Sequence, residues 1–308
     1  MTTPRSTLAP ATTHVEPPRY SRAAYSQLAL VVSIWAVNWV FVKFSLDQIS
    51  VVPFTAIRFT ASAVILGLIA SMCRQPILPA RGERLGMAAI GVLQVAGLIG
   101  LGTIALQYTT VGRGTVLTYT MQLWALPIGW LITREPIKPL ALAGGLVGFT
   151  GIVLFLNPLL VNWHDRRELF GNILMLVSAV NWAIASCLYR RRQWRTPFWT
   201  QTFWQLACSA LVMSVAAVFL RPARATVWSA WIVALLLFNC TFASGLCYFL
   251  WGKALAVMPA ARAGQVVSLV PVFALLLSAI FLGERVSIGA VTSMVVIGVG
   301  LFLTLRSR

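Results

Sequence analysis

The fold is decided by a stretch of sequence that occurs twice. Its first copy, residues 104–154, reads IALQYTTVGRGTVLTYTMQLWALPIGWLITREPIKPLALAGGLVGFTGIVL. Its second copy, residues 253–303, reads KALAVMPAARAGQVVSLVPVFALLLSAIFLGERVSIGAVTSMVVIGVGLFL. Ten of the 51 aligned positions are identical, and two of these are charged: Arg113 recurs as Arg262, and Glu135 as Glu284. Charged residues are scarce in this chain, so their recurrence at the same spacing around one apolar run predicts an internal repeat.

Apolar runs of membrane-spanning length make up most of the remaining sequence. The 308 residues are 59% hydrophobic and 10% charged, with a mean hydropathy of +0.83, whereas an ordinary soluble domain is about 25% charged. This composition excludes soluble enzymes, nucleic-acid-binding proteins and disordered scaffolds. A membrane-spanning helix needs roughly 20 apolar residues, and the pattern predicts ten such helices. They cover residues 25–44, 53–73, 84–106, 110–133, 138–157, 169–189, 197–220, 226–251, 260–283 and 286–305.

The repeat divides these helices into two groups of five. A second alignment places Trp35 over Trp182 and Lys43 over Arg190, so the similarity reaches the first helix of each group. Because five is odd, the two groups cross the membrane in opposite directions. Inverted repeats are the architecture of secondary transporters, with the substrate site near the midplane between them. We therefore predict an all-α integral membrane protein of ten transmembrane helices in two inverted five-helix repeats. The predicted parts are a flexible cytoplasmic tail (1–24), the first repeat (25–157), an external linker (158–168) and the second repeat (169–308).

The basic residues indicate the orientation of the chain. The net charge is +17, and Lys and Arg concentrate in cytoplasmic loops of membrane proteins. With the N-terminus in the cytoplasm, sixteen basic residues fall inside and seven outside, so both termini are predicted to be cytoplasmic. The first 24 residues are rich in Pro, Thr and Ser and hold no apolar core of the length that a signal peptide needs.

Few residues are available for catalysis or for a cofactor. The five cysteines are scattered and never spaced as CxxC, and both histidines lie outside the apolar runs, so we predict no disulfide framework, no metal, no cofactor and no enzymatic activity. None of the seven acidic residues falls in the middle of a predicted helix. A proton-coupled drug exporter generally needs a membrane-buried carboxylate, so this pattern favours uncoupled transport of neutral or zwitterionic solutes over proton-driven antiport.

Polar and aromatic side chains within the predicted helices are the candidates for a substrate site. Amide groups can pair with both the carboxylate and the ammonium of a zwitterion, and aromatic rings form an apolar wall. For each residue, helix packing or an interfacial position remains an alternative. Arg58 lies about five residues inside its helix and needs either a structural partner or a substrate carboxylate. The candidates are Trp35, Asn38, Trp39, Gln94, Tyr119, Gln122, Ser178, Asn181, Trp182, Ser244, Tyr248 and Trp251, with Arg58 as a charge partner.

Other residues are expected to have structural roles. The small residues Gly144, Gly148 and Gly151 favour close packing of one helix against another. Pro127 and Pro271 interrupt helical hydrogen bonding and predict bending points. Basic residues near helix ends are expected to reach lipid headgroups; they are Lys43, Arg113, Lys253 and Arg262.

Several segments resemble the drug/metabolite transporter superfamily, and in particular its ten-helix EamA-type permeases. The sequence WAVNW (35–39) followed by Lys43 is similar to the first-helix WGxN pattern of that family, with Ala36 in place of Gly. Arg58 is similar to its second-helix Arg. In the first repeat, TREP (133–136) replaces the usual GER. In the second repeat, the resembling segments are GLCYFLW (245–251), PAARA (259–263), LVPVF (269–273) and GER (283–285).

This resemblance implies a monomeric permease of the bacterial inner membrane that exports small molecules by alternating access. The aromatic-rich helices resemble the aromatic amino acid exporters of the YddG type, which implies amino acids and related metabolites as substrates. A proton-coupled multidrug or metabolite antiporter is the alternative within this class. A membrane-embedded enzyme or structural protein is the alternative outside it, although no cluster of catalytic residues supports an enzyme. The expected partners are the substrate and the lipid bilayer, and not nucleic acid.

Overall fold

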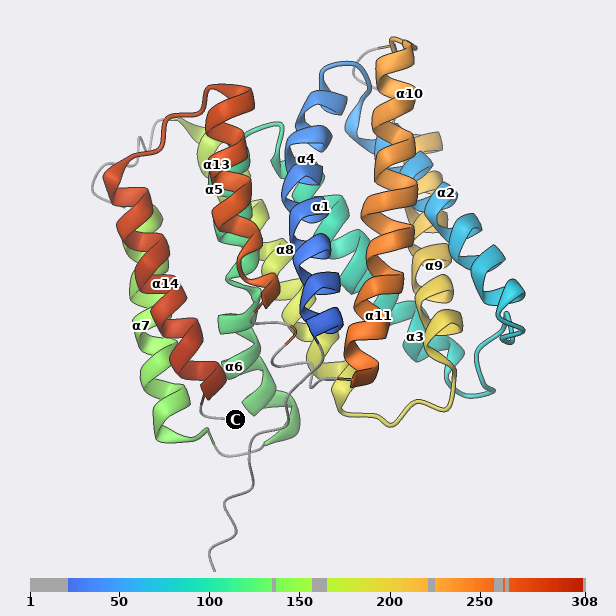
Figure 1. The fold of residues 1–308 in the computed structure, drawn as a ribbon, viewed down its shortest axis with the longest axis horizontal. Helices are drawn as coiled ribbons and strands as arrows, with labels where there is room; N and C mark the ends of the chain where they lie inside the picture. The colour runs from blue at the N-terminus through green and yellow to red at the C-terminus, as the bar shows by residue number, and fades with distance from the viewer. Residues whose placement is uncertain are drawn as a thin grey trace, which may run out of the picture.

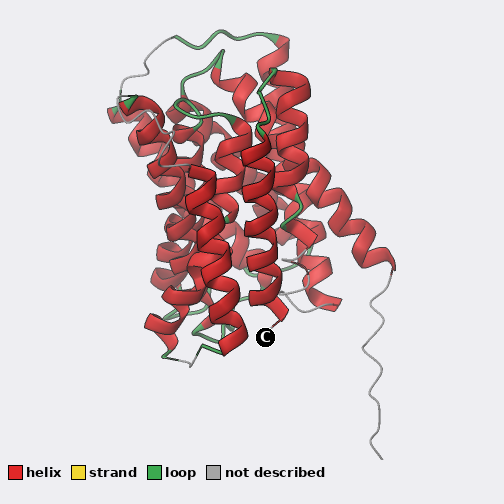
Figure 2. Cartoon of the chain, turned by 90° about the vertical axis from the view of Figure 1, so that its left-hand side faces the viewer, coloured by secondary structure: helices red, strands yellow, loops and turns green. Residues whose placement is uncertain are grey.

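The computed structural model describes residues 22–134, 137–156, 165–220, 225–257, 263 and 266–306, and all regular structure in them is helical (Figure 2). The first repeat contains α1 (Arg22–Leu46), α2 (Val51–Met72), α3 (Arg84–Gly91), η1 (Val92–Gly100), α4 (Leu101–Ala105), α5 (Val111–Tyr119), α6 (Met121–Thr133) and α7 (Pro139–Leu156). The second contains α8 (Arg166–Arg190), α9 (Phe198–Phe219), α10 (Ala230–Leu237), η2 (Phe238–Leu246), α11 (Cys247–Val257), α13 (Val270–Leu282) and α14 (Ile288–Arg306).

These elements form ten membrane helices, which confirms the predicted fold class. The segments α3, η1 and α4 continue into one another as one helix, and so do α10, η2 and α11. Six helices are both long and apolar enough to span a membrane, and α7, α13 and α14 are apolar but shorter. Helix α1 begins, and α14 ends, at the lower end of the bundle in Figure 1. The predicted tail and linker lie almost entirely outside the described residues.

Two predicted helices differ from those observed. The predicted helix 110–133 is broken at Thr120 into α5 and α6, because Thr120 ends one helix and begins the next. The predicted helix 260–283 is interrupted by a turn at 268–269, with the helical residues 263, 266 and 267 described before the turn and α13 after it. As a result, Pro271 lies at the start of α13 and not within it, while Pro127 lies inside α6 as predicted.

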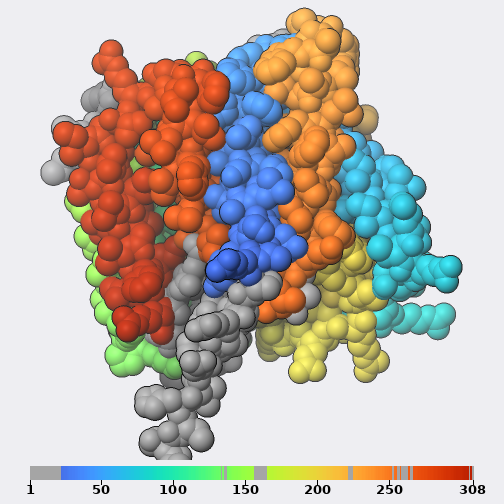
Figure 3. Space-filling view, viewed as in Figure 1, coloured from blue at the N-terminus to red at the C-terminus, as the bar shows by residue number. Residues whose placement is uncertain are grey.

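Contacts between the repeats occur in mirrored pairs. In the first repeat η1 packs against α8 and α9, and in the second η2 packs against α1 and α2. Helix α6 likewise packs against α8, as α13 does against α1. Consequently α1 lies between helices of the second repeat, with α13 on one side and the α10–α11 helix on the other (Figure 3). This exchange of partners is the arrangement expected of two similar halves related by a pseudo-two-fold axis.

The third helix of each repeat contains a π-helical segment of nine residues, η1 in one repeat and η2 in the other. The π-helix is rare and often occurs at functional sites, because its extra residue per turn shifts side chains relative to their neighbours. Its recurrence at equivalent places indicates that the distortion belongs to the repeat, and both segments face helices of the opposite repeat.

Helices α7 and α14 form a close-packed pair at one edge of the molecule (Figure 1). A Cβ atom added to Gly144 would lie 2.6 Å from the Thr304 backbone nitrogen. A Cβ atom added to Gly151 would lie 2.8 Å from the Ile297 backbone nitrogen. The prediction that these glycines serve helix packing is therefore confirmed, because no larger side chain fits between the backbones without a shift.

Charged side chains connect helix ends within the protein. Lys43 donates to the backbone carbonyls of Leu106 and Thr109, and Arg113 pairs with Glu168. The expectation that Lys43 and Arg113 reach lipid headgroups is thus wrong, since both side chains bind oxygen atoms of the protein. Lys253 is exposed and lies over the Phe249 ring, and Arg262 lies outside the described residues.

Candidate substrate-binding site

Four of the predicted aromatic residues gather around one small apolar cluster between α1 and α13. Trp35, Trp39, Tyr119 and Trp251 all pack against a core that includes Ala36. The ring centroids of Trp35 and Trp251 lie 6.3 Å apart. The structure thus brings together side chains from α1, α5 and α11, and the result is an aromatic wall to which both repeats contribute.

The position of Trp35 is fixed by a hydrogen bond to the opposite repeat. Its indole Nε1 donates to the carbonyl of Ala243, at 3.0 Å. Ala243 belongs to η2, so the π-helical segment holds the orientation of this ring.

A second group of predicted residues lies where η1 meets α8. A Cβ atom on Gly97 of η1 would lie 3.1 Å from the Cβ and Nδ2 atoms of Asn181, so the missing side chain makes room for this amide. Gln94, Asn181 and Trp182 are all half-buried. This contact between η1 and α8 mirrors the contact between η2 and α1, where Trp35 binds.

Three predicted residues have local roles in the structure. Ser178 is fully buried and donates to the carbonyl of Met175, while Ser244 donates to the carbonyl of Asn239. These are bonds within a helix, which leave the hydroxyl oxygens as acceptors only. Tyr248 packs against the apolar contact between α2 and α9 and is not among the residues that pack against the core with Ala36.

Six buried polar atoms have no hydrogen-bond partner among the described residues. Three belong to predicted residues: Asn38, Arg58 and Gln122. Two others, Asn239 and Trp124, also belong to the polar and aromatic side chains in the middle of the predicted helices. The sequence prediction left out only Ser62, which follows Arg58 by one helical turn. The atoms are Oδ1 of Asn38, Nε of Arg58, Oγ of Ser62, Oε1 of Gln122, Nε1 of Trp124 and Oδ1 of Asn239. An unpaired buried polar group costs about 1–3 kcal/mol, so these atoms are candidates for hydrogen bonds to a bound molecule.

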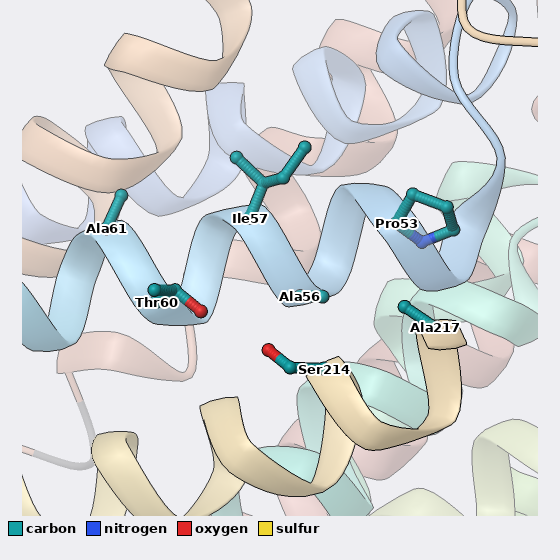
Figure 4. Close-up of a pocket in the computed structure, with 7 residues that line it drawn as sticks. All are labelled: Pro53, Ala56, Ile57, Thr60, Ala61, Ser214 and Ala217. Carbon is teal, nitrogen blue, oxygen red and sulfur yellow. The ribbon is translucent and has the colours of Figure 1, made fainter. Parts of the chain in front are cut away.

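The groove shown in Figure 4 lies elsewhere, between α2 and α9. It is mostly apolar and is lined by Pro53, Ala56, Ile57, Thr60, Ala61, Ser214 and Ala217. None of the predicted site residues lines it. Its position on the outer pair of helices in Figure 1 places it on the surface expected to face lipid.

No group of acidic, cysteine and histidine residues that could hold a metal ion occurs within the described part of the chain. The described carboxylates all lie at helix ends. Asp47 follows α1, Glu83 and Asp165 precede α3 and α8, Glu168 lies in the first turn of α8, and Glu284 follows α13. The polar groups inside the bundle are therefore amides, hydroxyls, indoles and one guanidinium.

A ten-helix bundle of two inverted repeats, with partnerless polar atoms in its interior, defines a membrane transporter. The model of the EamA-like transporter family matches residues 23–157 and again residues 169–306. The chain belongs to this family, which is part of the drug/metabolite transporter superfamily.

Individual relatives agree with this assignment. The chain is 25% identical to the uncharacterized transporter YoaV of Bacillus subtilis, over 89% of this chain and 93% of that protein. It is 30% identical to the uncharacterized protein PA1977 of Pseudomonas aeruginosa, over 84% and 86% of the two chains. A solved structure, described only as a crystal structure of a protein, has the same fold, with a TM-score of 0.63 at 18% identity over 91% of this chain and 96% of that one. The subgroup of aromatic amino acid exporters stays a prediction.

Proposed function

We propose that the protein is a permease of the bacterial inner membrane that exports zwitterionic or neutral metabolites, foremost aromatic amino acids. The observation that carries this proposal is the aromatic wall of Trp35, Trp39, Tyr119 and Trp251 in a bundle whose buried amides have unpaired oxygens. Aromatic rings provide a stacking surface, and amide oxygens accept hydrogen bonds from an ammonium group.

Alternating access is supported by the mirrored contacts of the two repeats. Each repeat packs its π-helical segment against the first two helices of the other, so exchanging the two conformations would exchange which end of the bundle is open. Where α13 ends and α5 begins, the Glu284 carboxylate accepts hydrogen bonds from the backbone N–H groups of Val111 and Gly112, at 2.7 and 2.9 Å. Opening between α5 and α13 at this end requires these bonds to break.

Transport driven by the gradient of the substrate itself is supported by the position of the acids. A proton antiporter generally uses a carboxylate that is buried in the membrane. The described carboxylates lie at helix ends, while Glu16 and Glu135 are outside the described residues. We propose uncoupled facilitation for this reason, and cytoplasmic termini from the distribution of basic residues.

Counterflow in proteoliposomes tests the proposal. Vesicles loaded with unlabelled phenylalanine, tyrosine or tryptophan should accumulate the labelled amino acid, and a protonophore should not change the rate. Loss of exchange on collapse of the pH gradient would instead identify a proton-coupled antiporter. Absence of exchange across a full panel of amino acids would contradict the proposed substrate class.

A matched pair of tryptophan variants tests the aromatic wall. Trp251→Ala should lower exchange about two- to tenfold, because one aromatic contact is worth about 0.5–1.5 kcal/mol. Trp228→Ala should leave exchange unchanged, since Trp228 precedes α10 and its side chain is 62% exposed. Equal exchange by the two variants would exclude Trp251 from the site.

A further inference from the structure

Arg58 is a buried charge with no opposite charge beside it. It lies on α2 about two turns, or roughly 10 Å, from the first residue, Val51. Its side chain is only 5% exposed, and its Nε has no hydrogen-bond partner. Among the described residues the only ion pair is Arg113 with Glu168. A charged group inside a membrane protein is costly unless it is paired or faces water. Binding of an anion beside Arg58 would therefore be favourable, because it would pair this charge.

Partnerless polar atoms of complementary kinds lie on α2 and on two segments that pack against it. Ser62 lies one turn beyond Arg58 on the same helix, and its fully buried hydroxyl lies beside the Cys240 thiol with no nitrogen or oxygen partner among the described residues. Asn239 of η2 and Asn38 of α1 each have an unpaired amide oxygen. The three segments α1, α2 and η2 pack on one another, and the Cys240 thiol of η2 donates to the backbone carbonyl of Arg58. Donors on α2 and acceptors on α1 and η2 are what a carboxylate and an ammonium group need, respectively.

The other repeat shows that the fold does not require a charge here. Helices α2 and α9 both have 22 residues, and the alignment that places Trp35 over Trp182 also places Arg58 over Gln205 and Ser62 over Ser209. Ser209 donates to the carbonyls of Gly91 and Gln205, both at 2.9 Å. In α9 the equivalent serine thus has hydrogen-bond acceptors on its own helix and on the facing one. In α2, Nε of Arg58 and Oγ of Ser62 have no such partner among the described residues.

We propose that Arg58, together with the hydroxyl of Ser62, binds the carboxylate of the transported molecule. This inference rests on the proposed function and narrows it, because substrates must then carry a carboxylate. The guanidinium presents parallel N–H donors that match the two oxygens of a carboxylate, and such charged pairs are stronger than neutral hydrogen bonds. Amides, esters and amines with the same side chain leave the buried charge unpaired and bind weakly.

Ligand-induced thermal stabilisation of the purified full-length chain in detergent tests the proposal directly. The probes share a phenyl ring: phenylalanine, 3-phenylpropionate without the ammonium, and phenethylamine without the carboxylate. We expect the wild-type protein to bind phenylalanine and 3-phenylpropionate at least about tenfold more tightly than phenethylamine, as one charged hydrogen bond implies. Equal affinity for phenethylamine and 3-phenylpropionate in the wild type would overturn the proposal without any mutation.

Variants at the two equivalent positions locate the effect. Arg58→Gln should abolish the preference for carboxylates, and Arg58→Lys should retain part of it, because lysine keeps the charge without the fork of donors. Gln205→Ala is the matched control on α9 and should keep the preference. If Arg58→Gln does not fold, the Arg58→Lys variant must still show a reduced preference, and an unchanged preference in it would contradict the proposal.

Counterflow with the same three compounds separates this inference from the function on which it rests. If wild-type vesicles exchange phenylalanine and Arg58→Gln exchanges it equally well, transport stands and the role of Arg58 is excluded. If no amino acid is exchanged, but 3-phenylpropionate stabilises the wild type and not Arg58→Gln, the carboxylate site stands and the proposed substrates are wrong.

Discussion

The pair α7 with α14 and the pair α2 with α9 are each built from equivalent helices of the two repeats, yet they differ in how their contacts are filled. Between α7 and α14 the same contact occurs twice. Gly151 meets Ile297, and at the equivalent positions Gly300 meets Gly148. Helices α2 and α9 have the same length and also pack on each other, but Arg58 in one corresponds to Gln205 in the other.

This difference separates what the fold needs from what the function needs. Gly151 and Gly300 are equivalent, and a Cβ atom on either would meet the backbone of the facing helix, so the close approach of the two helices restricts this position to glycine in both repeats. A bound molecule without two-fold symmetry instead requires different side chains at equivalent positions. The α7–α14 contact is therefore a structural one, and the difference between Arg58 of α2 and Gln205 of α9 is what the proposed carboxylate site requires.

The largest effect is expected when the α7–α14 contact is broken. A Cβ atom on Gly300 would lie 2.3 Å from the Gly148 backbone nitrogen, so Gly300→Leu must push the helices apart. We expect it to lower the free energy of unfolding by about 3 kcal/mol, as in severe overpacking. Thermal unfolding in detergent, followed by circular dichroism, measures the change.

Gly298 provides the control on the same helix. A Cβ atom there would meet no atom within 4 Å, so Gly298→Leu should unfold at nearly the wild-type temperature. If both variants lose the same stability, helix propensity and not the close contact controls this pair, and the contrast with α2 and α9 disappears.

A smaller effect is expected from the two equivalent serines. Ser209→Ala removes the one hydroxyl donor that lies at hydrogen-bond distance from two carbonyls and should lower the free energy of unfolding by about 1 kcal/mol. Ser62→Ala removes a hydroxyl without a partner, so the stability of the ligand-free protein should stay within about 0.5 kcal/mol of wild type or rise.

The affinity for a carboxylate ligand should respond in the opposite way to the stability, with the larger effect in Ser62→Ala. Ser62→Ala should weaken binding of 3-phenylpropionate, and Ser209→Ala should leave it unchanged. Denaturant unfolding and ligand-dependent thermal shifts measured on the same preparations give both quantities. A loss of stability in Ser62→Ala as large as in Ser209→Ala would mean that Ser62 has a structural partner.

The architecture could be predicted from the sequence because it depends on patterns that are local or repeated. Apolar length determined the helices, and the recurrence of Arg113 and Glu135 as Arg262 and Glu284 revealed the two halves. The glycines of α7 were recognisable because spacing by three or four residues places small residues on one helix face.

Details that depend on partners in space were not predictable. Nothing local distinguishes the π-helical segments η1 and η2 from ordinary apolar helix, because the distortion is set by packing against the opposite repeat. Arg113 was expected at the headgroups, since only the folded chain shows Glu168 beside it. Of the candidate site, the sequence predicted Arg58 and the individual aromatic residues, and the structure shows which of these residues lie together. It missed Ser62 because a serine in a helix usually bonds to its own backbone.

The smallest effect on stability is expected at the N-terminal ends of the third helices of the two repeats, where the repeats also differ most clearly. Glu83 is the N-cap residue of α3, and Ser229 is the N-cap residue of α10. The Glu83 carboxylate accepts hydrogen bonds from the N–H groups of Arg195 and Thr196 and from the Thr196 hydroxyl. The Ser229 hydroxyl instead donates to the amide of Gln48. The start of the third helix is thus held by an ionisable side chain in the first repeat and by neutral side chains in the second.

Only the contribution of Glu83, at the start of α3, to stability should depend on acidic pH. The hydrogen bonds from Arg195 and Thr196 lower the pKa of Glu83 below its ordinary value. A carboxylate whose pKa is lower in the folded than in the unfolded protein contributes stability above the unfolded pKa of about 4.3, and this stability is lost as the pH falls through the folded pKa. Glu83→Gln should therefore be less stable than wild type at pH 7, and the gap should narrow as the pH falls below about 4. Ser229→Ala should differ from wild type by the same amount at both pH values. The test is to measure the unfolding temperatures of the three proteins at pH 7 and at acidic pH. If Glu83→Gln differs from wild type by the same amount at both pH values, the charge of the Glu83 carboxylate does not stabilise this end of α3.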